Sequence, residues 1–457
     1  LGYVTDTQEL DVQKSITSLV IALAEDNLRL ESAVVTAKEN TNSATTSRTI
    51  DKAALEHIQL MNVAAVTGLL PGGTTSSGSL TSEQTISLRG GGSFNTSVEV
   101  DGIRMSNNAS FSSSSGVTTN NIASSNVESV EIITGVPSAE YGDLNSGMVK
   151  INTRKGRTPV NVTFSVNPRT YQASVSKGID LQEDNGVLNL SAEWARAVKK
   201  LISPYESYTR TGITLGYSNT FAKALRFEAG FTGNIGGMNS KDDPDVFTGQ
   251  FEKERDNVFR GNTSLTWLLN RSWVTNLKLD ASVNFNDNLY HFHKYESYAS
   301  NQPAVHSELE GYYLADRLPL TYFSDQVIDS KELDFAASLK YNWHKRWDET
   351  KSSLKAGLQW KANGNVGEGE YYMDPSLAAD GYRPRPYSQY PFMHNLSVYA
   401  EEHLTVPVAS TRLEVTAGLR LENVFIKNSL YNNKTTLSPR FNAKWQLTML
   451  YLLLKDG

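Results

Sequence analysis

The sequence predicts a mainly β protein in which a small α+β domain precedes a long series of antiparallel strands. Three observations support this fold class. Two β-branched segments lie at residues 85–100 and 127–153, apolar and polar residues alternate from Pro159 onward, and the connections after that point alternate between short and long. The chain has 457 residues, of which 39% are hydrophobic and 20% are charged. That length and composition suffice for two or three domains with cores.

Composition excludes several classes of protein. The formal net charge is only -6 and the basic residues are spread along the chain, which argues against a nucleic-acid interface. The chain contains no cysteine, so disulfides, thiolate metal sites and cysteine nucleophiles are excluded. The apolar run at residues 19–24 is much shorter than the about 20 residues of a membrane-spanning helix. Because the chain begins at Leu1 without a signal sequence, we expect its natural N-terminus to lie upstream.

The first fifty residues differ in character from the rest. Residues 1–30 contain two β-rich segments separated by a polar turn, a pattern typical of a hairpin at the end of a small sandwich domain. Residues 31–50 are polar, rich in Thr and Ser, and without periodicity. We therefore expect an extended linker there, with one apolar patch at residues 33–37.

Residues 51–157 predict a compact α+β unit. An acidic cap at Asp51 precedes a short helical pair that ends before Pro71 and Gly72. The apolar residues of this pair recur on one helical face, at Leu55, Ile58, Met61 and Val66. The two β-branched segments follow, and a Ser- and Asn-rich loop at residues 107–125 separates them.

From residue 158 onward the chain predicts about twelve strands, most of them near the 9 to 11 residues of a tilted membrane strand. In residues 277–285, apolar side chains at odd positions alternate with polar ones at even positions. The same period of two, which sends the two sets to opposite faces of a sheet, recurs at residues 333–343 and 412–422. A soluble sandwich with one wet face would also show this alternation.

Connection lengths favour a membrane barrel over a sandwich. Short connections at residues 269–272, 346–351 and 406–410 alternate with long ones at 236–253, 291–330 and 365–392. Outer-membrane barrels have short periplasmic turns and long outer loops. Aromatic residues gather beside the short turns, as an interface girdle would: Trp267, Trp273, Trp343 and Trp347.

Two stretches of the α+β unit carry a family resemblance. LRGGGSFNTSVEVDGIRM contains an Arg-Gly turn and an Asp-Gly turn, at Arg89, Gly90, Asp101 and Gly102. VESVEIITGVPSAEYGDLNSGMVKINTRKG contains Glu128, Glu131, Gly135, Tyr141, Gly142, Gly147 and Asn152. On these residues the chain resembles the TonB-dependent outer-membrane receptors that carry a carboxypeptidase-regulatory-like domain ahead of the plug.

The resemblance implies a domain layout. Residues 1–30 would be the C-terminal remnant of the carboxypeptidase-regulatory-like β-sandwich, 31–50 the TonB-box linker, 51–157 the plug domain and 158–457 a partial transmembrane β-barrel. Twelve strands are about half of a 22-stranded barrel, and no terminal aromatic residue follows. We therefore expect a chain truncated at both ends and an open, curved half-barrel.

The apolar patch in the linker is similar to the TonB box, which such receptors offer to a TonB-type energy-coupling protein in the periplasm. Its members are Ala33, Val34, Val35, Thr36 and Ala37. A β-branched segment in a flexible linker can add to the sheet edge of another protein and transmit a pull. An ordinary linker strand is the alternative interpretation.

Candidate ligand residues lie in the predicted long loops. His291 and His293 form an HxH pair that could contact a metal, although exposed histidines are usually only solvated. Tyrosines and arginines in clusters suit recognition of a sugar, siderophore or peptide, with loop packing as the alternative: Tyr295, Tyr298, Tyr312, Tyr313, Tyr371, Tyr372, Tyr382, Arg383 and Arg385. The seven histidines show no catalytic triad spacing.

The resemblance implies an energy-coupled transporter in the outer membrane of a Gram-negative bacterium, neither an enzyme nor a cofactor protein. Its partners would be the coupling protein, outer-membrane lipid and a scarce solute such as a siderophore, glycan, peptide or vitamin. The stretch SAEYGDLNSGMVKI departs from the starch-utilisation type, which puts a surface lipoprotein lid in doubt. A surface-binding protein or adhesin without transport is the alternative function, and a soluble glycan-binding β protein is a third.

Overall fold

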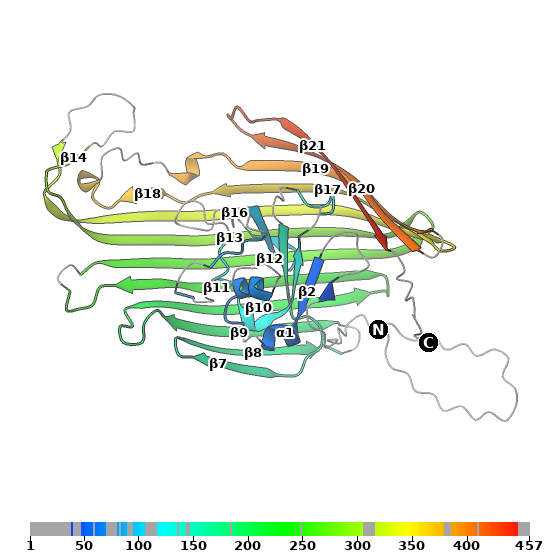
Figure 1. Ribbon diagram of the computed structural model, residues 1–457, viewed down its shortest axis with the longest axis horizontal. Coiled ribbons are helices and arrows are strands. Elements are labelled where there is room, and N and C mark those ends of the chain that lie inside the picture. Colours follow the sequence, from blue (N-terminus) through cyan, green and yellow to red (C-terminus); the bar gives the residue numbers. More distant parts are fainter. Residues whose placement is uncertain are drawn as a thin grey trace, which may run out of the picture.

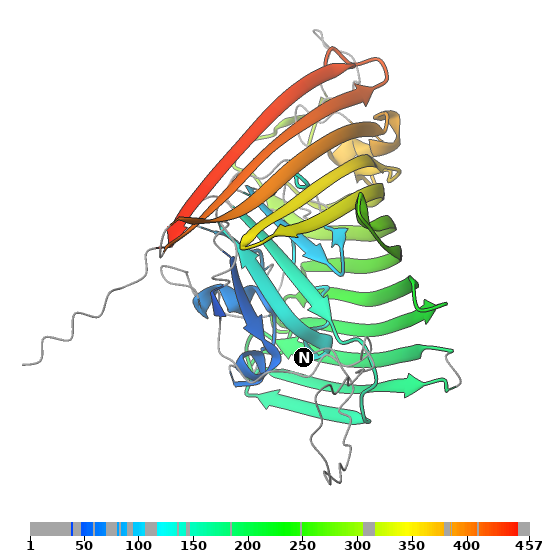
Figure 2. The same cartoon turned by 90° about the vertical axis from the view of Figure 1, so that its right-hand side faces the viewer.

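The computed structural model consists of a small mixed sheet lying inside a large curved sheet (Figures 1 and 2). It describes residues 38–39, 47–57, 60–69, 80–81, 84–88, 95–105, 117–134, 137–142, 147–182, 185–246, 249–304, 316–378, 384, 386–408 and 411–446. The predicted sandwich remnant at residues 1–30 and the predicted box lie outside the described residues. We call the small domain the plug and the large sheet the barrel wall.

The plug is an α+β unit, as predicted. Its six strands lie in the order β1-β2-β5-β6-β3-β4, and all pairs are antiparallel except β3 with β6. The strands are β1 (Lys38–Glu39), β2 (Ser47–Asp51), β3 (Thr96–Val100), β4 (Ile103–Arg104), β5 (Val127–Ile133) and β6 (Gly147–Thr153). The hydrophobic core of the plug includes Ile50, Val63, Val130 and Ile151.

The predicted helical pair is present in a shortened form. Helix α1 (Lys52–His57) is followed by the 3-10 helix η1 (Val63–Leu69), and a second 3-10 helix, η3 (Ser124–Asn126), precedes β5. The carboxylate of Asp51 accepts a hydrogen bond from the backbone N–H of Ala54 at 3.0 Å, which confirms the acidic cap. Leu55 and Val66 of the predicted apolar face are buried.

The barrel wall is a path of twelve antiparallel strands, each paired with the next along it, which agrees with the predicted number. The strands are β7 (Asn161–Asn167), β8 (Thr170–Asp180), β9 (Val187–Val198), β10 (Glu206–Phe221), β11 (Leu225–Lys241), β12 (Phe251–Arg271), β13 (Val274–Ser297), β16 (Thr321–Trp347), β17 (Thr350–Asn365), β19 (Met393–Val408), β20 (Thr411–Ile426) and β21 (Lys434–Gln446). Within the described residues β7 and β21 are the two edges, so the sheet is open, as expected.

Short elements occupy the connections at one end of the wall. Strand β18 (Gly369–Tyr372) pairs with β16, and β14 (Pro303–Ala304) pairs with β15 (Asp316–Arg317). The 3-10 helices η4 (Pro375–Leu377) and η5 (Tyr387–Gln389) lie between β18 and β19. At the other end, β12–β13 and β16–β17 are joined by two-residue turns, at the places predicted for short connections.

Several strands are far longer than the 9 to 11 residues expected. Strands β12, β13 and β16 have 21, 24 and 27 residues. The predicted long connections at 236–253 and 291–330 were therefore wrong in part. Strand β11 continues to Lys241 and β12 begins at Phe251, while β13 continues to Ser297 and β16 begins at Thr321. Pairing continues where polar and aromatic residues occur on both faces, so the hydrophobic alternation that marks a half-buried strand is lost there.

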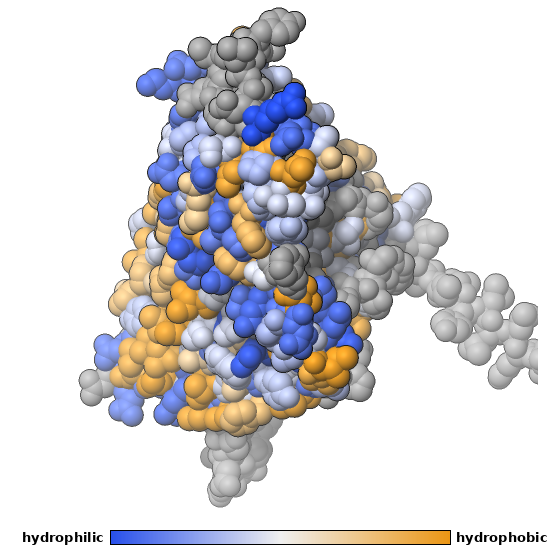
Figure 3. Space-filling view, turned by 90° about the vertical axis from the view of Figure 1, so that its left-hand side faces the viewer, coloured by the Kyte–Doolittle hydropathy of each residue, from blue (hydrophilic) through white to orange (hydrophobic). Residues whose placement is uncertain are grey.

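The two faces of the wall have opposite character. Leu279 on β13 is 50% exposed on the outer face, whereas Asn284 on the inner face of the same strand is 1% exposed. The plug elements lie on the concave side of the curved sheet (Figure 2). Figure 3 shows apolar residues gathered along the left and lower margins of that view, with hydrophilic ones in its middle. The wall thus has an apolar outside and a polar lumen.

None of the helices among the described residues has the length and apolar character that crossing a membrane would require.

Candidate functional site

The turn between β3 and β4 ties the plug to the wall. It contains the predicted Asp101 and Gly102, whose φ angles of 49° and 85° both lie in the left-handed region. The carboxylate of Asp101 accepts hydrogen bonds from the backbone N–H of Thr153 at 3.0 Å and from its hydroxyl at 2.6 Å. The backbone carbonyl of Asp101 accepts one from Asn262 on β12 at 3.0 Å.

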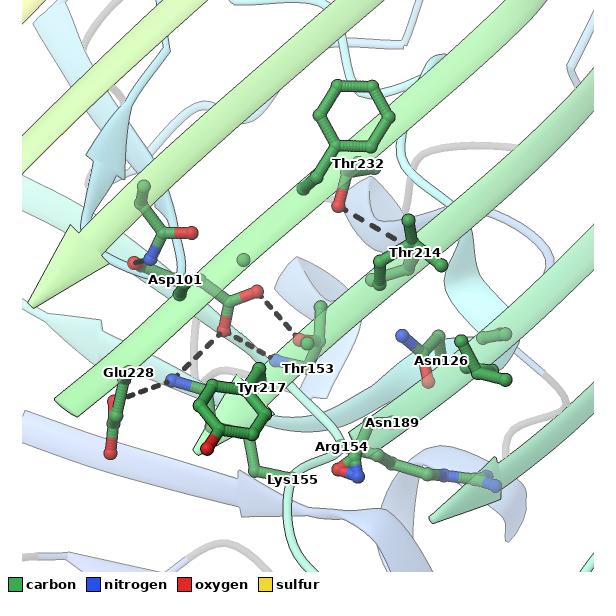
Figure 4. A pocket seen from close by; sticks show the side chains of 18 of the residues that line it. Asp101, Asn126, Thr153, Arg154, Lys155, Asn189, Thr214, Tyr217, Glu228 and Thr232 are labelled. Carbon is green, nitrogen blue, oxygen red and sulfur yellow. Dashed lines mark hydrogen bonds and ion pairs between the residues drawn. The ribbon is translucent and has the colours of Figure 1, made fainter. Parts of the chain in front are cut away.

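Figure 4 shows this turn at the side of a small cavity of about 50 Å³. Lys155, just beyond β6, reaches between the plug and the wall. Its Nζ is 3.9 Å from Asp101 Oδ1 and 3.5 Å from Glu228 Oε2 on β11. The predicted Asp-Gly turn therefore joins two plug strands and two barrel strands.

The plug segment 137–142 is held by Arg420 on β20. This guanidinium is fully buried, and its Nη1 donates to the backbone carbonyls of Ala139 at 3.2 Å and Glu140 at 2.9 Å. Its Nη2 lies 2.8 Å from Oε1 of Glu422. A wall cation thus binds plug backbone while a wall carboxylate neutralises it.

Strands β19 and β21, which flank β20, also contact this segment. The Glu401 carboxylate on β19 accepts from the backbone N–H of Ala139 at 2.6 Å and from the hydroxyl of Ser138 at 2.8 Å. Arg440 on β21 donates to the carbonyl of Tyr141 at 2.5 Å. Apart from the Ser138 hydroxyl, these contacts use backbone atoms of the plug, so they depend on the path of the segment more than on its side chains.

The predicted glycines Gly142 and Gly147 stand where a side chain would collide. A Cβ at Gly142 would lie 2.5 Å from Glu422 Oε1, and one at Gly147 would lie 2.6 Å from the carbonyl oxygen of Ile133. Gly147 also has a φ of 147°. Gly147 requires glycine because the close atom is backbone, whereas at Gly142 the close atoms belong to the side chains of Glu422 and Arg420.

An ion pair between the plug and β16 lies next to this segment. Lys340 Nζ is 2.6 Å from Glu140 Oε1 and 2.9 Å from Asp280 Oδ2 on β13. Burial alone would raise the pKa of Glu140, but the Lys340 ammonium holds it below its ordinary value. The predicted Tyr141 is partly buried, and its hydroxyl accepts from Lys150 at 2.5 Å. Burial raises the pKa of Tyr141, as do the carboxylates around it.

A second plug segment, residues 119–126, is held by a buried ion pair on the wall. Arg210 on β10 and Glu193 on β9 form this pair, and each side chain is 1% exposed. Arg210 donates to the carbonyl of Asn120, which also accepts from the Tyr208 hydroxyl at 3.0 Å. Glu193 accepts from the backbone N–H of Ser125 at 3.0 Å and from its hydroxyl.

Asn121 extends this second contact to β11 and β12. Its Oδ1 accepts from Arg260 at 2.9 Å, its Nδ2 donates to Asp256 at 3.2 Å, and its carbonyl accepts from Asn234 at 2.8 Å. One asparagine therefore uses three polar atoms to bind three wall side chains.

Sequence reasoning did not identify residues 119–126 or their wall partners. It assigned most of this segment to a polar loop. The available signal was the placement of Glu193, Arg210, Asp256 and Arg260 at inward positions of strands whose other faces are apolar. Charged residues at such positions indicate a polar lumen or a bound domain.

A cavity of about 510 Å³ lies between the plug sheet and the part of the wall from β11 to β19. Its plug side carries Glu99 and the predicted Glu131, and its wall side carries Lys278, Lys340 and Lys355. Burial raises the pKa of Glu99, although Lys150 opposes the shift. The cavity offers a charged, hydrated space inside the wall.

Several predicted residues lie outside the described part of the chain. These are the box, Ala33 to Ala37, the Arg-Gly turn of Arg89 and Gly90, and the loop residues Tyr312, Tyr313, Tyr382, Arg383 and Arg385. Of the described tyrosines, Tyr295 and Tyr371 share the outer face with His291, whereas Tyr372 lies on the opposite face. Tyr298 packs against Tyr322 at 6.2 Å.

The HxH pair lies on strand β13 and not in a loop as predicted. His291 Nε2 and His293 Nδ1 lie 2.7 and 2.9 Å from the same oxygen, Oδ1 of Asp325 on β16. The ring of His293 stacks between Phe251 and Phe323, at 4.9 and 4.8 Å. Within the described ranges, no group of three or more His, Cys, Asp or Glu side chains could hold a metal ion.

Comparison with protein-family models gives two matches. The model described as TonB-dependent Receptor Plug Domain matches residues 37–149. The model described as TonB dependent receptor-like, beta-barrel matches residues 193–452, which is more than half of the chain. A comparison with curated protein sequences found no match.

Solved structures share the fold at low sequence identity. FpvA of Pseudomonas aeruginosa, in complex with a pyoverdine and iron, aligns over 90% of this chain with a TM-score of 0.64 and 12% identity. The siderophore receptor PirA of Acinetobacter baumannii aligns over 88% with a TM-score of 0.59 and 16% identity. The alcaligin outer-membrane receptor FauA of Bordetella pertussis aligns over 90% with a TM-score of 0.56 and 14% identity.

This chain spans 56%, 59% and 61% of the lengths of those three proteins.

Proposed function

This chain belongs to the TonB-dependent receptor family of transport receptors, and on that premise we propose that it mediates energy-coupled uptake of a scarce solute across the outer membrane of a Gram-negative bacterium. The apolar outer face of the barrel wall suits contact with lipid. The short turns would face the periplasm and the long connections the outside.

One observation carries the proposal: the plug has its own hydrophobic core and is held to the wall chiefly by polar contacts. The main core cluster consists entirely of plug residues. Among the residues that the structure describes, the apolar contact between plug and wall is a small cluster that joins Leu80 to Ala195, Ala197 and Tyr208 of the wall. Hydrogen bonds and ion pairs can be exchanged for water at a net cost of about 0.5–1.5 kcal/mol each. A pull can therefore displace such a plug without unfolding the barrel.

We assign that pull to the segment from Ala33 to Ala37. Its β-branched residues suit strand addition to a TonB-type coupling protein, and the linker leads directly into β2 of the plug. The tyrosines of the long-connection end, Tyr295, Tyr298, Tyr371 and Tyr372, are our candidates for solute capture. The similar solved structures have siderophores in their titles, so a ferric siderophore is the first solute class to test, before glycans, peptides and vitamins.

The proposal can be tested in cells that carry the protein at its natural length. Uptake and surface binding of labelled solutes are measured. A Val35→Pro change removes a backbone donor from the box, and Ser43→Pro places the same residue elsewhere in the linker. We expect Val35→Pro to abolish uptake and to leave surface binding intact, while Ser43→Pro preserves both. If neither change affects uptake, the box assignment is wrong. If the protein binds solutes but the cells import none, it is an adhesin or surface binder.

A further inference from the structure

The lumenal face of the wall becomes strongly basic toward the short turns. Strand pairing places Arg346, Lys351, Thr405, Glu414 and Lys444 in one row across β16, β17, β19, β20 and β21. Directly paired residues lie on the same face of a sheet, and alternate residues along a strand share a face. This row therefore faces the lumen, like Glu401 and Arg420, which contact the plug.

Nearby rows add further cations. Lys355 lies four residues from Lys351 on β17, and Arg412 lies two residues from Glu414 on β20. In the part of the chain that the structure describes, Lys351, Lys355 and Arg412 form no ion pair and no hydrogen bond through their side chains. Glu401 is bound to the plug, so Glu414 is the carboxylate left among these rows.

These cations line two adjoining spaces. Lys355 lines the cavity between plug and wall, and Ser353, two residues along the same strand, lines a second cavity of about 510 Å³ at the short-turn end. The second cavity is also lined by Arg346, Lys351 and Arg412. Four residues of a strand span about 13 Å, so an ion leaving one cavity at Lys355 meets Lys351 next along the same face of β17.

We infer that the solute of this receptor carries a negative group, such as a carboxylate, phosphate or sulfate, which Lys355, Lys351 and Arg412 bind in turn as it passes from the plug cavity to the short-turn end. The inference rests on the proposed function and names the substrate class. Unpaired cations in a partly enclosed space attract an anion more strongly than cations in open water. Lys223, exposed in the turn between β10 and β11, provides a contrast because it lines neither cavity.

Anion binding to the purified, full-length protein in detergent tests the inference without energy coupling. Because this chain has no cysteine, Ser353→Cys gives one defined site here for an environment-sensitive fluorophore beside Lys351 and Lys355. Citrate and inorganic phosphate serve as the probes, glucose as the neutral control. We expect saturable binding of the anions that weakens as salt is added.

Matched variants locate the binding. We expect Lys351→Gln and Lys355→Gln each to weaken citrate binding by about tenfold, the range for a charge-assisted contact. Lys223→Gln removes the same charge from the turn between β10 and β11, which lines neither cavity, and should leave binding unchanged. Lys355→Arg keeps the charge and should retain binding, which separates loss of the site from loss of folding.

Three results would overturn the inference: no saturable anion binding, equal weakening by Lys223→Gln, or binding of an acidic peptide but of neither small anion. A failure of the proposed function looks different. In that case the anions still bind the purified protein, but Val35→Pro does not alter uptake by cells.

Discussion

The ammonium of Lys340 on β16 and the carboxylate of Glu140 in the plug form an ion pair of 2.6 Å across the plug–wall boundary. Both side chains are shielded, with 21% and 15% of their surfaces exposed. Lys340 also contacts Asp280 on β13 at 2.9 Å. One cation therefore joins two barrel strands to the segment that carries the Tyr141-Gly142 motif.

Removal of this pair should loosen the plug before it affects the wall. We expect Glu140→Gln to lower the free energy of plug release by about 1–3 kcal/mol, since the Lys340 ammonium loses a shielded partner. A fluorophore at Ala53→Cys on α1 would report plug release in urea, and tryptophan fluorescence would report unfolding of the wall. The matched change Lys278→Gln removes a cation that pairs with Asp280 alone and should leave plug release unaltered. Equal effects of the two changes would contradict the assignment.

Plug release should also depend on pH through Glu140. The pKa of this group is lowered in the folded state, so its contribution is fully present above the ordinary value of 4.5 and is lost as pH falls through the lowered pKa. We expect less urea to release the plug as the pH drops below about 4.5. Glu140→Gln should remove this acid sensitivity.

Glu99 should give plug stability the opposite dependence on pH. Burial raises its pKa, so the folded plug binds a proton more readily than the released plug and is favoured by Glu99 at lower pH. In the Glu140→Gln variant, the stability of the plug against release should therefore fall as the pH rises. Adding Glu99→Gln to this variant should remove that dependence on pH. An unchanged acid transition in Glu140→Gln would exclude the Lys340 pair as its source.

The sequence predicted the plug and the strand number because both leave a periodic or motif signal. Alternation at residues 277–285 marks a strand with one apolar face, and Gly147 occupies a position that geometry restricts to glycine. The ends of β13 and β16 could not be predicted in this way. Near His291 the apolar side chains of Leu289 and Phe292 lie on opposite faces, so the pattern of a half-buried strand disappears while the hydrogen-bonded pairing continues.

The plug–wall contacts depend on juxtapositions that no local pattern encodes. Asn121 and Arg260 are 139 positions apart, and Ala139 and Arg420 are 281 apart. Their hydrogen bonds arise only once the wall has curved around the plug. Sequence alone could place Glu193 and Arg210 on one face of their strands, but not beside residues 119–126.

The motif glycines should differ in their tolerance of alanine. At Gly147 a Cβ would meet the backbone carbonyl of Ile133 at 2.6 Å, so Gly147→Ala should cost about 3 kcal/mol. At Gly142 the obstacle is Glu422 Oε1 at 2.5 Å, a side-chain atom that can shift, and about 1–2 kcal/mol is expected. At Gly102 nothing lies within 4 Å, leaving only the positive φ, which costs about 1 kcal/mol.

Urea unfolding of the three alanine variants checks this order. Gly249→Ala is a control for backbone strain alone, because it has a φ of 58° and no atom within 4 Å. It should match Gly102→Ala. A Gly142→Ala variant as stable as the parent would mean that the 137–142 segment is not seated against Glu422.

The buried pair of Arg210 and Glu193 should be the most sensitive contact between plug and wall. Each side chain is 1% exposed, and each binds plug backbone as well as its partner. Glu193→Gln leaves the Arg210 charge buried without a counter-ion, a change that costs about 3–5 kcal/mol. Replacing both residues, as Arg210→Met with Glu193→Leu, removes the stranded charge and should recover part of that loss. The exposed pair of Arg157 and Asp180, 3.3 Å apart, is the control, since Arg157→Gln should cost about 1 kcal/mol or less. Urea unfolding and plug release, measured on the same samples, would separate an effect on the wall from an effect on the plug. If the double variant is less stable than Glu193→Gln, the backbone contacts to residues 119–126 outweigh the stranded charge, and the pair acts mainly by positioning the plug.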